Sequence, residues 1–79
     1  IQRTALWVLA RGGYIDPGEV GRSSPRLYDD NNCLYALMSR QTLGVLCRRR
    51  WVDRASGPTG YDRYVISRPG RTVSLRFRP

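Results

Sequence analysis

Apolar residues recur at helical spacing near the start of the chain. One face of a helix over residues 3–11 would collect Leu6, Leu9 and Ala10, with Trp7 beside them. Gly12-Gly13 follows, and glycine is common where a helix ends in a left-handed backbone conformation. The pattern therefore predicts a helix over 3–11, followed by a minimal strand at Tyr14-Ile15.

Residues 39–50 carry the clearest amphipathic pattern in the chain. Ser39 is a good N-cap, and one helical face collects Leu43, Leu46, Cys47 and Arg50. Leu34, Leu37 and Met38 would fall on the opposite face of a continuous rod, so a break is expected near Met38-Ser39. The sequence thus predicts a separate helix over 39–50.

The segment between these two helices is predicted from turn and capping signals. Asp16-Pro17-Gly18-Glu19 is typical of a helix start, and Gly21 to Pro25 would end that helix early, so we predict a short helix over 16–22. Residues 29–32 allow two structures, namely a turn between two short strands or a cap on a helix over 33–38. We favour a loop followed by the helix.

The last third of the chain has the pattern of β-structure. Residues 51–54 and 62–67 predict two strands of a hairpin, joined by the Gly- and Pro-containing segment 56–60. Residues 72–78 alternate polar and apolar positions and predict a further strand with Val73, Leu75 and Phe77 inward.

A chain of 79 residues forms one small domain, here 1–79, and the predicted elements place it in the α+β class. With 41% hydrophobic residues it is expected to be globular. The core must be thin, so a few large side chains would carry it. The candidates are Trp7, Leu9, Leu43, Leu46, Trp51, Val52, Tyr64 and Ile66.

Several classes of function fit the composition poorly. There is no His, and two cysteines alone, Cys33 and Cys47, cannot supply the four ligands of a zinc site. Cys47 is expected to be a buried free thiol. No catalytic motif, cofactor loop or small-molecule substrate site is predicted, and no membrane span or secretory leader. We expect a non-enzymatic protein of the reducing cytoplasm or nucleoid.

The charge is strongly asymmetric. Residues 1–38 hold four Arg and four acidic residues, whereas residues 39–79 hold ten Arg and two acidic residues. The whole net charge of +8 therefore lies in the second half, and all 14 basic residues are Arg. A basic helix followed by a hairpin favours a polyanionic partner, most often nucleic acid.

The outward flank of the helix over 39–50 has the residues for reading bases. It presents Gln41, Gly44, Val45 and Arg48, flanked by Arg40, Thr42 and Arg49. Gln pairs with adenine and Arg with guanine, while a glycine lets the backbone approach a partner closely. With Arg54 and Arg63 on the hairpin, these nine residues form the predicted DNA-binding site, with no catalytic or metal-binding residue.

The order of these segments resembles the winged helix-turn-helix superfamily. The matching segments are TALWVLARGGYI, DPGEVGR, SRQTLGVLCRRRWVDR and YDRYVISRPGR, over residues 3–71. The resemblance implies three helices packed with a C-terminal hairpin wing and sequence-specific binding of double-stranded DNA, with residues 40–48 in the major groove and the 54–63 wing at the backbone or minor groove. Such a protein would be a small transcriptional regulator or a phage-type accessory factor. Ser23–Met38 departs from the family, whose second and third helices are joined by a turn of a few residues. Either this segment is an insertion, or residues 33–38 are the second helix and residues 16–22 are an addition to the family's fold.

Three alternatives stay open at this stage. The basic helix could be only a solvated surface. The domain could be a winged-helix docking module, or a homodimer, that uses a strand containing Val73, Leu75 and Phe77. Structured RNA is a third alternative, distinguished by a preference for A-form over B-form duplex.

Overall fold

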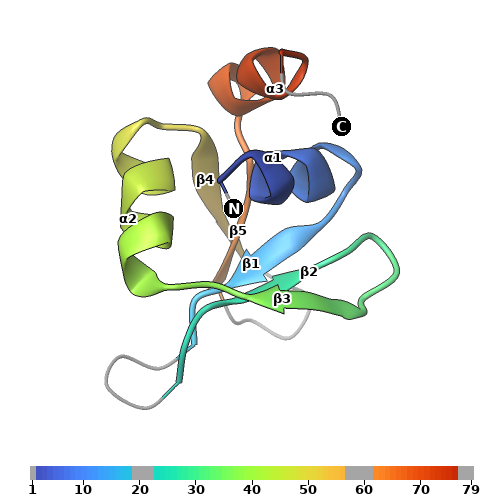
Figure 1. Cartoon of the computed structure of the whole chain (residues 1–79), viewed down its shortest axis with the longest axis vertical. Helices are drawn as coiled ribbons and strands as arrows, with labels where there is room; N and C mark the ends of the chain where they lie inside the picture. The colour runs from blue at the N-terminus through green and yellow to red at the C-terminus, as the bar shows by residue number, and fades with distance from the viewer. Residues whose placement is uncertain (1, 19–22, 57–61, 77–79) are drawn as a thin grey trace.

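The computed structural model describes residues 2–18, 23–56 and 62–76, and its elements alternate between helices and a sheet (Figure 1). The helices are α1 (Gln2–Ala10), α2 (Arg40–Arg48) and α3 (Arg68–Ser74). The strands are β1 (Tyr14–Asp16), β2 (Arg26–Tyr28), β3 (Leu34–Leu37), β4 (Val52–Ser56) and β5 (Asp62–Ile66). The α+β class predicted from the sequence is confirmed.

The five strands form one antiparallel sheet in the order β3-β2-β1-β5-β4. Ile15 in β1 is the centre of the register, because it lies opposite Leu27 of β2 on one side and Tyr64 of β5 on the other. Directly opposite residues point to the same face of a sheet. Ile15 and its two partners therefore share one face, and Tyr14, Tyr28 and the other alternate residues share the second.

The core lies between the first face and the helices. Its buried apolar residues come from α1, α2 and four of the strands and include Leu6, Leu9, Ile15, Leu27, Leu46 and Ile66. In Figure 1, α1 and α2 lie on the same side of the sheet, and α3 lies beside α1. Five of the eight predicted core residues are buried, and Trp7, Trp51 and Tyr64 pack against the core while partly exposed. The second face is left open by the described helices.

The two helices predicted with the clearest local signals are confirmed. α1 ends at the glycine pair, where Gly12 has a φ of +103°. Ser39 caps α2, because its hydroxyl accepts the Thr42 N–H at 3.0 Å. The hairpin of β4 and β5 follows α2 as predicted, with Val52 opposite Ile66. Its predicted loop lies largely outside the described residues.

The prediction of a helix over 33–38 is wrong, and the alternative of a turn between two strands is observed. Asp29 nucleates the turn, since its carboxylate accepts the N–H groups of Asn31 and Cys33. Asn32 has a left-handed backbone with a φ of +65°. The strand pairing buries Leu27 against the core, which a loop at this place would not achieve.

The prediction of a helix over 16–22 is wrong at its start. Asp16 is the last residue of β1, and its carboxylate accepts the Gly18 N–H at 3.0 Å. Gly18 has a φ of +68°, so this bond closes a tight turn and does not cap a helix. The remainder of the predicted helix, 19–22, lies outside the described residues.

The prediction of a strand over 72–78 is also wrong, because residues 68–74 form α3. Ser67 caps this helix by accepting the Gly70 N–H, and it also donates a hydrogen bond to the Arg50 carbonyl at 2.6 Å. Pro69 stands in the first turn, where its missing N–H costs nothing. Of the three residues predicted to point inward, Val73 packs against the core, Leu75 is exposed, and Phe77 lies outside the described residues.

Both cysteines are free thiols. Cys33 is exposed, and Cys47 is half-buried against the core and not fully buried as predicted. Within the described segments no group of three His, Cys, Asp or Glu side chains is placed to hold a metal ion. No helix in the same segments has the length and apolarity needed to cross a bilayer.

Candidate nucleic-acid interface

The solvent-facing flank of α2 has the composition expected of a base-reading surface. Leu43 and Leu46 are buried on the inner side of the helix, which turns the opposite side outward. On that side Gln41 and Arg48 are exposed, and Gly44 and Val45 lie between them, half-buried. The structure therefore brings the central four predicted residues together on one flank.

Gly44 makes this flank open. A Cβ atom built on Gly44 has no neighbouring atom within 4 Å, so nothing inside the protein requires a glycine there. Glycine inside a helix lowers stability by about 1 kcal/mol relative to alanine. A glycine that the fold does not need, in the middle of an exposed polar flank, is the arrangement expected where a partner approaches the backbone.

Replacement of Gly44 by alanine should therefore stabilise the free protein, and the DNA-binding role predicted for this flank adds a loss of DNA affinity. We expect a gain of about 0.5–1 kcal/mol in unfolding free energy, measured by urea denaturation. The added methyl group should lower DNA affinity severalfold in a fluorescence anisotropy titration. An alanine variant that is more stable and binds DNA as tightly as the parent would show that no partner contacts this position.

The residues flanking this surface are held by contacts with the rest of the fold. The Arg40 guanidinium donates to the Ser23 carbonyl at 2.8 Å, which ties the start of α2 to the segment before β2. At the other end, the Arg49 guanidinium lies 5.0 Å from the centre of the Trp51 ring. Thr42 shares a hydrogen bond with the capping Ser39. The contacts of Arg40 and Arg49 hold these two side chains against the folded domain, and they limit how far each guanidinium extends toward a partner.

The two hairpin arginines lie on different faces of the sheet. Arg54 is opposite Tyr64, so it points to the side that carries the helices, and it pairs with Asp62. Arg63 is opposite Ala55 and points to the open face, where its guanidinium lies 4.1 Å from the centre of the Tyr14 ring. The predicted site is therefore divided, with Arg54 on the side of α2 and Arg63 on the other.

Arg63 belongs instead to a stacked group on the open face. The Tyr14 and Tyr28 rings are 5.1 Å apart and nearly parallel, and Arg63 covers Tyr14. The sequence contains the tyrosines and the arginine, but their approach depends on the pairing of β1 with both β2 and β5, which local patterns do not reveal. This stack stabilises the sheet by covering its open side.

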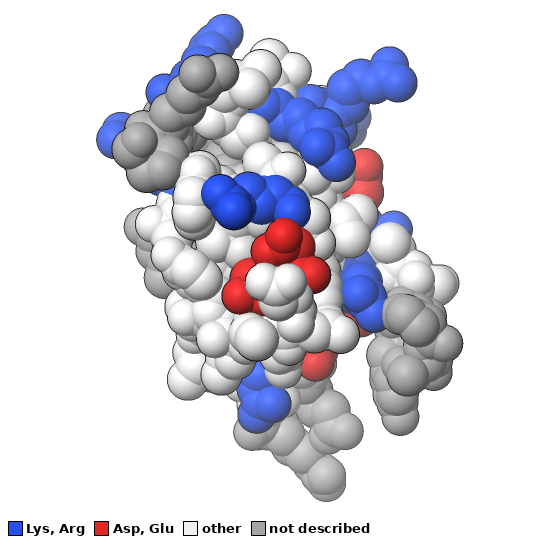
Figure 2. Space-filling model, turned by 90° about the vertical axis from the view of Figure 1, so that its right-hand side faces the viewer, with Lys and Arg blue, Asp and Glu red and all other residues white. Residues whose placement is uncertain are grey.

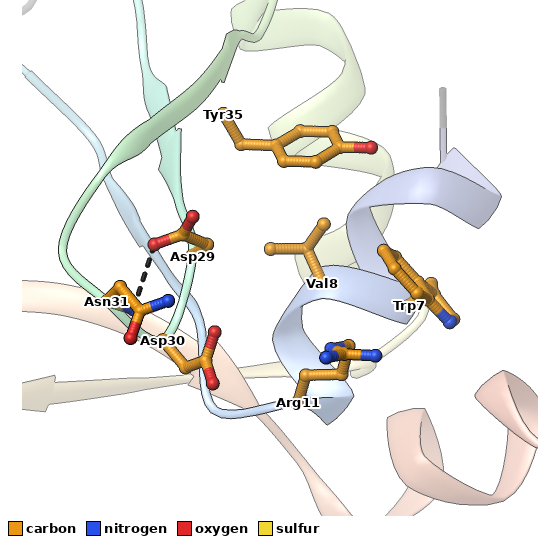
Figure 3. Close-up of a pocket in the computed structure, with 7 residues that line it drawn as sticks. All are labelled: Trp7, Val8, Arg11, Asp29, Asp30, Asn31 and Tyr35. Carbon is orange, nitrogen blue, oxygen red and sulfur yellow. Dashed lines mark hydrogen bonds between the residues drawn. The ribbon is translucent and has the colours of Figure 1, made fainter.

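A second candidate site is a shallow pocket between α1 and the β2–β3 turn. It has a volume of about 210 Å³, and its walls include the Trp7 and Tyr35 rings (Figure 3). Two of its polar groups already serve the fold: Arg11 lies 4.9 Å from the centre of the Trp7 ring, and Asp29 holds the turn. Part of the polar lining of this pocket is therefore already engaged in contacts within the fold.

The surface charge on the side away from α2 is mixed. Figure 2 shows this side, with acidic side chains gathered near its centre, one basic group directly above them and further basic groups nearer the rim. The described turn before β3 contributes Asp29 and Asp30 to the pocket wall. A mixed surface suits a polyanion less well than the segment from α2 into β4, where five arginines between positions 40 and 54 are exposed.

We compared the chain with models of known protein families, with curated proteins and with solved structures, and none of these three comparisons found a match.

Proposed function

We propose that this chain is a small winged-helix protein that binds duplex DNA with sequence preference. The flank of α2 enters the major groove, with Gln41 and Arg48 reading base edges and Gly44 allowing a close approach. Arg40, Thr42, Val45, Arg49 and Arg54 would contact the adjacent backbone or bases. The observation that carries the proposal is the open, polar flank of α2 around Gly44.

The arrangement of elements supports this proposal in part. β1, β5 and β4 are neighbours in the sheet, and α2 runs directly into the β4–β5 hairpin, which is the order expected of a helix followed by a wing. In the order of elements along the chain, the β2–β3 hairpin takes the place of the second helix of the family. We therefore assign no DNA contact to the segment between β1 and α2.

The expected role is that of a small transcriptional regulator or phage-type accessory factor in the nucleoid, with no enzymatic activity. The alternative role as a docking module through a C-terminal strand loses its basis, because residues 68–74 form a helix. Arg63 is assigned no groove contact, since it faces away from α2.

The proposal is tested by selection from a random-sequence DNA library, followed by titration of the selected duplex. We expect one enriched motif for the parent protein. Arg48→Ala should weaken binding to that motif by about 1–3 kcal/mol, roughly 5- to 150-fold, and should relax the preference at one base pair. Arg26→Ala is the matched control, because Arg26 is equally a surface arginine but lies on β2 opposite Asp16, on the open face.

Each outcome of this test decides between the candidates. Equal losses for Arg48→Ala and Arg26→Ala would mean that α2 is not the contact surface. If the selection enriches no sequence and neither substitution changes binding, α2 is only a solvated surface and the proposal is rejected. Tighter binding to an A-form RNA duplex than to DNA of matching sequence would replace DNA by RNA as the partner.

A further inference from the structure

The strand β3 lies at one edge of the sheet. It is the first strand in the order β3-β2-β1-β5-β4, so its outer side has no described neighbour. The Met38 N–H donates to the Pro25 carbonyl at 2.8 Å, and alternate residues of an antiparallel strand face the same neighbour. The N–H and C=O of Leu37 therefore point outward, away from β2, where they can form hydrogen bonds with another strand.

The side chains of β3 are unusually apolar for an exposed strand. Among the described residues four large apolar side chains are exposed, and three of them, Leu34, Tyr35 and Leu37, belong to β3. The other edge strand, β4, is different because it carries the charged Asp53 and Arg54. Charged side chains are the common means by which proteins keep an edge strand from pairing, and β3 has none.

A bulge places two of these leucines on one face. Leu34 lies opposite Tyr28, and Leu37 lies opposite Arg26, with a register shift between them. Tyr28 and Arg26 are two positions apart in β2 and share the open face. Leu34 is 54% exposed and Leu37 is 60% exposed, so a second strand laid along this edge would cover both.

We propose that β3 pairs in antiparallel orientation with β3 of a second copy of this chain. The charges on either side of β3 favour this occupant. Asp29 and Asp30 precede the strand, and Arg40 follows it. Antiparallel pairing about a two-fold axis places the acidic turn of each copy beside Arg40 of the other copy, so the same attraction occurs at both ends of the paired strands. The apolar strand thus meets an apolar strand, and each acidic end meets a basic end.

The dimer is expected to be weak. A strand of four residues is about 13 Å long and buries less than a standard interface of about 1,600 Å². We therefore expect a dissociation constant on the order of micromolar or weaker. This inference goes beyond the proposed function, since it concerns the edge strand β3 and requires no DNA. Arg40, at the start of α2, is the residue that both proposals use.

Sedimentation velocity over a range of protein concentrations tests the dimer. The average mass should rise from 9.1 kDa toward twice that value as concentration increases. Leu37→Lys should raise the dissociation constant at least about tenfold, because it places a charge in the pairing strand. Leu75→Lys is the matched control, since Leu75 is 64% exposed at the end of α3, and it should leave the association within about twofold of the parent.

Amide hydrogen exchange supplies an independent measurement of the same pairing. The Leu37 amide should exchange quickly in dilute protein and become protected at high concentration, whereas the Leu37→Lys variant should show no such change at position 37. A protein that stays at 9.1 kDa up to millimolar concentration would overturn the inference. Equal loss of association in Leu75→Lys would also overturn it, because the interface would then lie elsewhere. DNA binding by a strictly monomeric protein would leave the proposed function intact.

Discussion

Replacing Gly70 by alanine is expected to lower the free energy of unfolding by about 3 kcal/mol or more, because the protein has no room for the added methyl group. A Cβ atom built on Gly70 would lie 2.1 Å from the Trp51 carbonyl oxygen and 3.0 Å from a methylene of Ile66. The first of these neighbours is backbone, at the point where the chain leaves α2 for β4. It cannot rotate aside as a side chain could.

The clash has a large effect because several contacts converge on the same place. Ser67 joins this junction through its hydrogen bonds to the Gly70 N–H and the Arg50 carbonyl, and its own N–H donates to the Trp51 carbonyl at 2.9 Å. Moving α3 to admit a methyl group would strain all of these bonds. A domain of this size has roughly 4–12 kcal/mol of stability in total, so the loss is a large share of it.

Urea denaturation followed by circular dichroism measures this loss, with Gly44→Ala as the control. Both variants add one methyl group to a helical glycine, but the Gly44 methyl meets open space. The two changes in the free energy of unfolding are expected to have opposite signs, because Gly70→Ala should be less stable than the parent and Gly44→Ala more stable. A Gly70→Ala variant within about 1 kcal/mol of the parent would mean that α3 does not pack against the start of β4 as described.

The proposed binding to DNA is expected to weaken about 150-fold when the salt concentration rises from 50 to 200 mM. Five exposed arginines lie between positions 40 and 54, and four of them are available for phosphates when Arg48 reads a base edge. Each contact with a phosphate releases bound counterions, so four contacts predict a slope of about −3.6 in a plot of log affinity against log salt concentration. The large effect follows from the concentration of charge in one part of the chain, since residues 1–38 carry no net charge.

Titrations at several salt concentrations give this slope directly. Arg49→Ala should make the slope shallower by about one unit, whereas Arg26→Ala on the open sheet face should leave it unchanged. A slope near zero for the parent protein would exclude an interface built on phosphate contacts. A steep slope that responds equally to both variants would indicate binding spread over the whole surface and not centred on α2.

The elements that were predicted correctly are those whose signals are local. α2 has a capping serine, an apolar face and a strongly polar flank within twelve consecutive residues, so its existence and its outward residues could be identified from spacing alone. The glycine pair after α1 and the strand-like segments on either side of the Gly- and Pro-containing loop of the hairpin are signals of the same kind. For this reason the α2 part of the candidate site was predicted, including Gln41, Gly44 and Arg48.

The elements that were predicted wrongly depend on partners far away in the chain. Residues 33–38 have apolar spacing that is compatible with a short helix, but pairing with β2 carries Leu27 into the core beside Ile15. Residues 72–78 alternate like a strand, yet the cap at Ser67 starts a helix that Val73 anchors to the core. In both cases burial of apolar surface against a distant element outweighs the local pattern.

The amino-acid sequence by itself determined a small α+β chain with one amphipathic basic helix, a hairpin after it and all net charge in the second half. These properties follow from composition and from spacing within a turn or a strand. Only the tertiary structure decided which arginines share a surface, because the face of Arg63 depends on the register of β5 with β1 and β4. It also decided that β3 lies exposed at an edge, since strand order is set by contacts between residues distant in the chain.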